Sequence, residues 1–326
     1  MARIALDAMG GDRAPQEAVG GAVDAAGRGV DVVLVGDEAV LRPLLARHGA
    51  DLPVVHAPEA IGMGDDVGAA VRDKRRSSIS VAARMVAEGE AAGLVSAGST
   101  GATVAAGAIL VGRAAGVSRP ALAGIFPVGH PTVVLDIGAN LEVRPDNLVQ
   151  FAVMGALLAQ VYLGVADPAV GLLNVGEEKG KGRTLEKEAF ALLEEAPVRF
   201  VGNVEGRDLG RESVDVFVTD GFTGNVLLKG TEGMASAVGR LVLAALSDED
   251  PAMQAALPAV LPRVIAVRDR FDPDTHGGAH LLGTRGTVVV AHGSASRRGV
   301  ANALVLAAEG AERGLVGRIE AGLGRG

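Results

Sequence analysis

The chain contains no cysteine and very few aromatic residues, with seven Phe, one Tyr and no Trp among 326 residues. Without cysteine there is no disulfide, no thiol nucleophile and no Cys-ligated metal site. Nucleic-acid modules that stack bases need several exposed aromatic rings. The composition therefore excludes thiol enzymes and argues against nucleic-acid binding, and it is consistent with a cytoplasmic protein.

Positive charge is also scarce. The 31 Lys and Arg residues are outnumbered by 39 Asp and Glu, which gives a formal net charge of −8. No overall field attracts a polyanion, so an acidic protein partner needs a local basic patch. The densest candidate precedes a predicted helix near Ser77 and consists of Arg72, Lys74, Arg75 and Arg76. An ordinary solvated run of charges explains these residues equally well.

Membrane-spanning segments and the common cofactor motifs are not found either. Two uncharged stretches, residues 91–112 and 147–166, reach the length of a membrane span but contain Ser, Thr, Gln or Gly in their middle. We expect both to be buried elements of a soluble protein. The sequence has no Walker A loop, no GxGxxG after a strand, no GxSxG elbow and no HExxH. Seryl hydrolases, zinc hydrolases and ATP-driven kinases therefore lose support.

Short β-branched runs alternate with alanine-rich segments along the whole chain. The predicted strands are Arg3–Leu6, Val30–Val35, Pro53–Val55, Leu94–Ser96, Thr132–Leu135, Val170–Asn174, Val198–Val201, Val214–Thr219 and Thr287–Ala291. The predicted helices are Pro15–Ala26, Glu38–His48, Arg183–Glu195, Thr223–Leu246 and Gly299–Arg313. This alternation predicts a doubly wound α/β fold, a mostly parallel sheet with helices on both faces. We expect one domain over residues 1–326, with a helical hairpin inserted at about 236–270.

Glycine is abundant, at 47 of 326 residues, and it gathers in six loops that follow predicted strands. We expect all six at one edge of the sheet, where ligands bind in such folds. Backbone N–H groups at strand-to-helix turns bind anions, so the expected ligand is phosphate. A tight turn without a ligand remains the better explanation of any single loop. The candidate binding residues are Asp7, Gly10, Gly11, Asp12, Ser96, Gly98, Ser99, Thr100, Gly101, Asn140, Asn174, Gly176, Asp220, Gly221, Gly224, His292 and Ser294.

Three side chains near these loops have two interpretations each. Lys181, between two glycines, could reach a bound anion or be a solvated loop lysine. Asn225 could donate to a carbonyl oxygen or cap a helix. His292 could act as a general acid or base or be a hydrogen-bonded core residue.

In sequence order, the motifs DAMGGD, SAGSTGA, DIGAN, NVGEE followed by KG, GNVEGRD, DGFTGN and GGA…LLG…HGS resemble the PlsX family of bacterial phosphate acyltransferases. The resemblance extends from residue 4 to about 300. It implies an enzyme that transfers a fatty acyl group from acyl carrier protein to inorganic phosphate, with no cofactor or metal. The acyl phosphate product would serve a glycerol-3-phosphate acyltransferase in phospholipid synthesis.

The resemblance also implies a fold related to isopropylmalate dehydrogenases and phosphotransacetylases. A homodimer is implied, located in the cytoplasm and associated peripherally with the inner face of the cell membrane. By the same resemblance Lys181 and Asn225 are the catalytic residues, one for phosphate and one for the carbonyl oxygen. The family usually has Pro where this chain has His280.

Three other functions remain open at this stage: a phosphotransacetylase-type enzyme that uses acyl-CoA, an NAD-dependent dehydrogenase, and a non-catalytic membrane-associated scaffold. Membrane contact is expected from residues 253–270, through an apolar and cationic surface. Pro258 and Pro262 should break or kink a helix there. Packing in a dimer interface is the alternative for this surface, whose residues are Val260, Leu261, Arg263, Val264 and Arg268.

Overall fold

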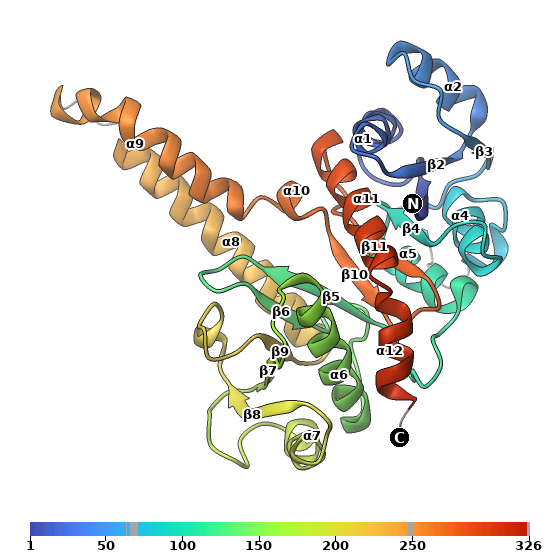
Figure 1. Ribbon diagram of the computed structural model, residues 1–326. Coiled ribbons are helices and arrows are strands. Elements are labelled where there is room, and N and C mark those ends of the chain that lie inside the picture. Colours follow the sequence, from blue (N-terminus) through green and yellow to red (C-terminus); the bar gives the residue numbers. More distant parts are fainter. Residues whose placement is uncertain (63, 66–70, 247–250, 325–326) are drawn as a thin grey trace.

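A single sheet of eleven strands organises the molecule, in the order β3-β2-β1-β4-β11-β10-β5-β6-β9-β7-β8 (Figure 1). The structure is a computed structural model and describes every residue except 63, 66–70, 247–250 and 325–326. The strands are β1 Arg3–Asp7, β2 Asp31–Gly36, β3 Val54–His56, β4 Gly93–Ser96, β5 Ala121–Phe126, β6 Thr132–Leu135, β7 Ala169–Leu173, β8 Arg199–Val204, β9 Val216–Val218, β10 Ala279–Leu282 and β11 Thr287–Val290.

The sheet is mostly parallel, as predicted, but its two halves run in opposite directions. Strands β1, β2, β3, β4 and β11 are parallel to one another. Strands β6, β7, β8 and β9 are also parallel to one another. Between these halves, β10 is antiparallel to both β11 and β5, and β5 is antiparallel to β6.

The prediction that all six glycine loops lie at one edge is therefore wrong. The loops after β1, β4 and β11 leave one edge of the sheet, and those after β6, β7 and β9 leave the opposite edge. The reversal is produced by β5 and β10, two strands that the sequence analysis did not identify. Both are rich in Ala, Gly or Leu rather than in β-branched residues, so strand propensity does not mark them.

Helices cover both faces of the sheet, as predicted (Figure 1). Their bounds are α1 Gln16–Gly27, α2 Glu38–Arg47, α4 Ser78–Ala87, α5 Thr100–Ala106, α6 Pro145–Tyr162, α7 Thr184–Glu194, α8 Gly221–Leu246, α9 Pro251–Arg270, α10 Pro273–His276, α11 Arg297–Glu312 and α12 Leu315–Leu323. A π-helical turn, Gly107–Val111, follows α5. Among the described residues, no helix has the length and apolar composition needed to cross a membrane.

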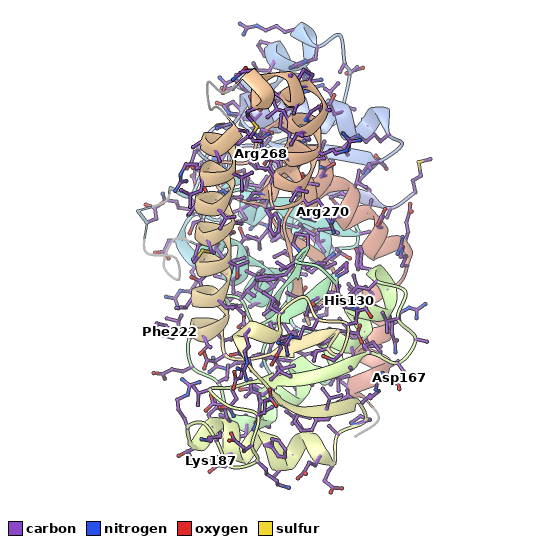
Figure 2. All side chains as sticks on the ribbon, turned by 90° about the vertical axis from the view of Figure 1, so that its left-hand side faces the viewer. His130, Asp167, Lys187, Phe222, Arg268 and Arg270 are labelled. Carbon is purple, nitrogen blue, oxygen red and sulfur yellow. The ribbon has the colours of Figure 1, made fainter. Side chains whose placement is uncertain are left out.

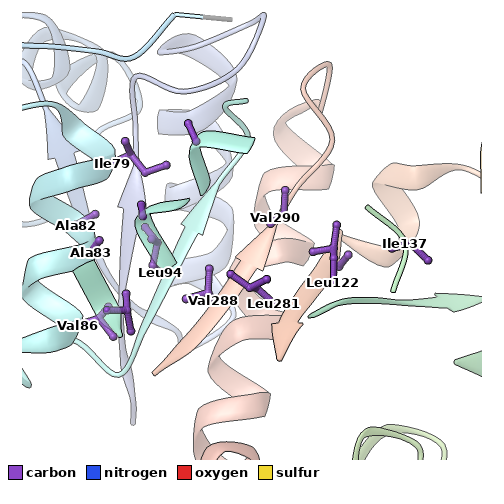
Figure 3. Packing of buried hydrophobic residues seen from close by; sticks show 14 of the residues in the cluster. Ile79, Ala82, Ala83, Val86, Leu94, Leu122, Ile137, Leu281, Val288 and Val290 are labelled. Carbon is purple, nitrogen blue, oxygen red and sulfur yellow. The ribbon is translucent and has the colours of Figure 1, made fainter. Parts of the chain in front are cut away.

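Three hydrophobic clusters lie between these helices and the sheet. The first extends from α4 across β4, β11, β10 and β5, part of which Figure 3 shows, and continues to Val134 of β6 and Phe217 of β9. The second is built around α6 and the strands β5, β6, β7 and β9, and the third around α1 and α11. Because the first cluster crosses the antiparallel centre, the two halves share one continuous core.

Helices α8 and α9 lie side by side and project from the sheet as a hairpin (Figure 1). Of the break or kink predicted at Pro258 and Pro262, the break does not occur, because α9 continues through both prolines. Both prolines are exposed, so solvent can serve the carbonyl groups that a proline leaves without a helical N–H donor. Treating residues 1–326 as a single domain stays a prediction.

The centre of the sheet buries an ionisable residue, His280 of β10, which is only 3% exposed. Its Nε2 has no hydrogen-bond partner among the described residues. Its ring lies 5.1 Å from the ring of Tyr162, whose hydroxyl donates to the backbone oxygen of Leu306 at 2.8 Å. Burial lowers the pKa of His280 to about 4 from 6.5 because the charged imidazolium loses its hydration.

We predict that His280 makes the fold sensitive to acid. Its pKa is lower in the folded than in the unfolded chain, so stability is lost as the pH falls from about 6.5 towards 4. At pH 4.5 the loss from this group is about 2 kcal/mol. Urea unfolding at pH 7 and pH 4.5 measures it, with the His280→Leu variant as reference. Equal losses for the wild type and the variant would contradict the prediction.

Candidate functional site

Three glycine loops at one edge of the sheet are joined into one unit, called here the first loop group. It consists of residues 7–12, 96–101 and 292–294. The backbone N–H of Asp12 donates to the oxygen of Gly293 at 2.8 Å. A Cβ on Gly10 would lie 2.9 Å from the backbone nitrogen of Gly98, so only glycine permits this approach. The group therefore presents closely packed backbone.

The buried carboxyl group of Asp7 forms hydrogen bonds with residues of two loops of this group. Its oxygens accept from the Ser96 hydroxyl at 2.7 Å and from the backbone N–H of Met9 at 3.3 Å. The Ser96 hydroxyl in turn accepts from the N–H of Gly98 at 3.0 Å. Burial raises the pKa of Asp7, which reduces its repulsion of a nearby anion. Asp7 and Ser96 thus position the loops rather than offering donors to a ligand.

The N-terminus of α5 is the part of the first loop group best suited to an anion. Its N-cap residue, Ser99, makes no side-chain capping bond. The first N–H groups of a helix have no partner within the helix, and here these include those of Thr100 and Gly101. With the helix dipole they form a region of positive potential.

His292 supplies a side-chain donor beside this helix end. Its Nδ1 accepts from the backbone N–H of Ser294 at 3.2 Å and lies 2.8 Å from the Ser294 hydroxyl oxygen. Because a backbone N–H can only donate, the neutral ring carries its proton on Nε2. The ring is exposed and lines the pocket described below, so the suggested alternative of a core histidine does not apply.

Three further loops at the opposite edge form the second loop group: residues 136–140, 174–183 and 220–225. The Asp136 carboxylate accepts from the backbone N–H groups of Gly138, Ala139 and Asn140 at 2.9, 2.8 and 2.7 Å. The Asn140 side chain donates to Asp136 and to the oxygen of Pro120. Although burial raises the pKa of Asp136, its carboxyl group occupies the donors that a phosphate would need.

The N-terminus of α8 is occupied in a similar way. Asp220 accepts from the N–H of Thr223 at 2.7 Å and forms an ion pair with Arg183, which also pairs with Glu186. A Cβ on Gly224 or Gly221 would collide with backbone oxygens. In contrast to α5, this helix end is capped by a carboxylate of the chain itself.

Lys181 and Asn225 lie in the second loop group but in different surroundings. The Lys181 side chain is 53% exposed, and its Nζ is 3.9 Å from a Glu178 carboxylate oxygen. Asn174 donates to the backbone oxygen of Lys181 at 3.2 Å, and the Lys181 stem lies over Gly176. Lys181 does not line the pocket, so the structure does not bring it together with Asn225 there.

Asn225 is held at the pocket by its neighbours. Its Nδ2 donates to the oxygen of Ile137 at 3.1 Å, which uses one of the two N–H groups of the amide. Gly138 has a φ of +142°, and a Cβ there would lie 3.1 Å from this nitrogen. Glycine at position 138 therefore makes room for Asn225.

A pocket of about 210 Å³ lies between the two loop groups. Thr100 and His292 line it from the first group, and Ile137 and Asn225 from the second. The rest of its wall is mainly apolar. Its base includes members of the first hydrophobic cluster, of which Figure 3 labels Leu122, Ile137 and Val290.

The sequence analysis missed several polar residues of this pocket. Lys229 and Glu232, paired at 2.9 Å, line it from α8, and His276 lines it from α10. A signal for Lys229 was present, because it lies four residues after Asn225 and thus on the same helix face. Nothing in the local sequence marks His276. Among the described residues, no cluster of His, Asp or Glu side chains is suited to a metal ion.

The remaining predicted residues lie away from the pocket. In the candidate docking patch, Arg72, Arg75 and Arg76 are exposed, while Lys74 pairs with Asp65 at 2.6 Å. In the candidate membrane segment, the apolar residues Val260, Leu261 and Val264 are half-buried. Arg263 and Arg268 of the same segment are exposed.

The comparison with known proteins gives a consistent result. A family model described as fatty acid synthesis protein matches residues 2–318. A phosphate acyltransferase from Thermus thermophilus is 48% identical over 321 residues, which cover 97% of each chain. That of Heliobacterium modesticaldum is 44% identical and covers 98% of this chain and 96% of its own.

Solved structures resemble the chain in fold. A phosphotransacetylase from Streptococcus pyogenes aligns with a TM-score of 0.62 at 17% identity, over 95% of this chain and 94% of that chain. A 4-hydroxythreonine-4-phosphate dehydrogenase from Klebsiella pneumoniae gives 0.55 at 16% identity, over 95% and 98%. These likenesses confirm the predicted phosphotransacetylase-like α/β fold. From the family match and the sequence identities, the chain belongs to the fatty acid synthesis protein family and is an enzyme of the acyltransferase class.

Proposed function

We propose that the chain transfers a fatty acyl group from acyl carrier protein to inorganic phosphate. The observation that carries this proposal is the pocket itself. It is mainly apolar, as an acyl chain requires, and it lies between an uncapped helix N-terminus suited to phosphate and the amide of Asn225. The names of the relatives, phosphate acyltransferases, support the same reaction class.

In this proposal phosphate binds to the first loop group, because the second has committed its backbone donors to Asp136 and Asp220. A phosphate oxygen attacks the thioester carbon, the new C–O bond forms and the C–S bond breaks. The sulfur leaves as a thiolate and takes a proton from solvent, while the Nε2–H of the neutral His292 ring serves as a hydrogen-bond donor. The free N–H of Asn225 donates to the carbonyl oxygen as negative charge develops on it.

The acyl phosphate product would pass to a glycerol-3-phosphate acyltransferase for phospholipid synthesis. Acyl-CoA is the alternative donor, and no feature of the pocket wall separates the two carriers. The exposed arginines 72, 75 and 76 support a carrier protein, which is acidic, because opposite charges guide docking. Lys181 stays a candidate for phosphate on the family resemblance.

We predict different kinetic defects for the two candidate catalytic residues. With acyl carrier protein thioester and phosphate, and acyl phosphate trapped by hydroxylamine, Asn225→Ala should lower kcat by about 10²–10³. Lys181→Ala should raise the KM for phosphate and leave kcat nearly unchanged, because Lys181 does not line the pocket and can act on phosphate only by attracting the anion from a distance. Lys187→Ala, an exposed lysine on α7 (Figure 2), is the matched control.

The same assay tests the proposed reaction. Wild-type protein that forms no hydroxamate from either carrier-protein or CoA thioesters would overturn it. Equal rates with both donors would favour the acyl-CoA alternative. A folded Asn225→Ala protein with wild-type kcat would remove Asn225 from the mechanism.

We predict that docking of the carrier protein is electrostatic. Raising the salt concentration should increase the KM for acyl carrier protein, because ions screen exposed charges beyond about 10 Å at 0.1 M. Charge reversal with Arg75→Glu and Arg76→Glu should increase it further. A second double variant, Arg119→Glu with Lys187→Glu, changes two exposed residues outside the patch and controls for the same change in net charge. A KM that responds to neither salt nor reversal rules out this docking surface.

We also propose that the hairpin makes the homodimer and the peripheral membrane contact expected for this chain. It carries exposed apolar side chains, among them Met234 at 65% and Leu241 at 71% exposure. The variant Leu241→Asp should lose flotation with anionic liposomes while remaining folded. If its mass in solution halves and flotation persists, a second copy covers this face and the membrane contact lies elsewhere.

A further inference from the structure

The lining of the pocket carries very little charge. Among its described lining residues, Lys229 is the only lysine or arginine and Glu232 the only carboxylate. These two side chains pair with each other, at 2.9 Å between the Lys229 Nζ and a Glu232 carboxylate oxygen. Before a substrate binds, the charges of the described lining therefore balance.

An anion that enters a mainly apolar pocket needs an opposite charge, because losing its hydration without one is costly. The N-terminus of α5 supplies only partial charges. His276 adds no donor in its neutral form. Its Nε2 lies 2.6 Å from the backbone oxygen of Arg270, and because a carbonyl oxygen only accepts, Nε2 carries the proton and Nδ1 can only accept. A full positive charge in the described lining therefore has to come from Lys229.

Lys229 lies on the same face of α8 as Asn225. The two residues are four positions apart, which places one above the other on the helix surface, about 6 Å apart along the helix axis. Both line the pocket, and Thr100 and His292 line the same pocket from the first loop group. A phosphate bound between the start of α5 and Asn225 is therefore next to the wall that carries Lys229.

The ion pair with Glu232 does not prevent Lys229 from binding an anion. The two side chains are 53% and 32% exposed, and an exposed pair of this kind adds little to stability. A phosphate oxygen can therefore replace the carboxylate oxygen as the partner of the ammonium. Lys181 is equally exposed, at 53%, and also lies near a glutamate, but it does not line the pocket.

We propose that the Lys229 ammonium binds inorganic phosphate in the pocket and that Glu232 is its partner until phosphate arrives. On binding, Nζ exchanges a Glu232 oxygen for a phosphate oxygen, and no covalent bond forms or breaks. Glu232 then remains nearby as a like charge, which weakens the binding of phosphate and favours its exchange. This inference rests on the proposed acyl transfer and adds to it the residue that neutralises the attacking anion.

The two members of the pair should have opposite effects on phosphate. Lys229→Met should raise the KM for phosphate by about tenfold, the usual effect of one charged hydrogen bond, and leave kcat nearly unchanged. Glu232→Gln should lower this KM by about twofold, because a partly exposed like charge is removed. Lys229→Arg keeps the charge and should restore most of the affinity. Lys187→Met and Glu188→Gln, exposed on α7 and outside the pocket, are the matched controls.

A binding measurement separates this inference from the proposed reaction. Titration with inorganic phosphate in the absence of an acyl donor, followed by phosphorus NMR, should give a Kd about tenfold higher for Lys229→Met than for the wild type. Glu232→Gln should give a lower Kd. If the wild type forms no acyl phosphate, the reaction fails, but this titration still decides whether Lys229 binds phosphate. An unchanged Kd in Lys229→Met would overturn the inference.

The acyl donor also carries a phosphate group, in the pantetheine arm of the carrier protein or of CoA. If Lys229→Met raises the KM for the acyl donor but not that for inorganic phosphate, the ammonium binds the arm and the inference is wrong. A lower kcat with unchanged KM and Kd for phosphate would also contradict it, because the ammonium would then act on the carbonyl oxygen.

Discussion

The antiparallel pairing of β5 with β10 at the centre of the sheet is the constraint on which the site depends. In this pairing Ala123 lies opposite His280 and Ala121 opposite Leu282. Together with the antiparallel pairings of β10 with β11 and of β5 with β6, it reverses the strand direction between the two halves. The carboxyl ends of β4 and β11 therefore leave one edge and those of β6 and β9 the other. A uniformly parallel sheet would collect all glycine loops at one edge. Here the two loop groups instead reach the pocket from different sides, which suits a reaction that joins two substrates.

Three aspartates determine which of the two loop groups keeps backbone N–H groups available for a ligand. Asp136 and Asp220 follow β6 and β9 and accept bonds from backbone N–H groups of their own loops. Asp7 is the last residue of β1 and accepts mainly from a hydroxyl and the N–H groups of the turn that follows, which leaves the start of α5 uncapped. Glycine-rich sequence alone does not distinguish these cases, because an anion-binding loop and a carboxylate-filled loop have the same composition. The difference lies in where the aspartate side chain points.

The sequence therefore predicted the parts of the fold that depend on local pattern. Nine strands with continuous β-branched runs were identified, and helices such as α1 and α2 were placed to within a residue or two. The antiparallel strands β5 and β10 were missed because their residues, such as Gly124 and His280, do not favour a strand by themselves. Their conformation comes from neighbouring strands far away in sequence. The same limit applies to α9, where two prolines predict an interruption that their exposed position makes unnecessary.

The sequence predicted which loops contribute to the candidate site but not how these loops are arranged in space. Spacing on one helix could have connected Lys229 with Asn225, whereas His276 and Phe271 reach the pocket only because the hairpin returns to the sheet. The apolar wall of the pocket could not be predicted from the sequence for a related reason. Leu122, Ile137 and Val290 belong to the hydrophobic core and also face the pocket, and one apolar residue looks like another until the fold shows which part of the core is left open. The pocket is thus an unfilled margin of the core, and an apolar ligand in it continues the same packing that holds the two halves of the sheet together.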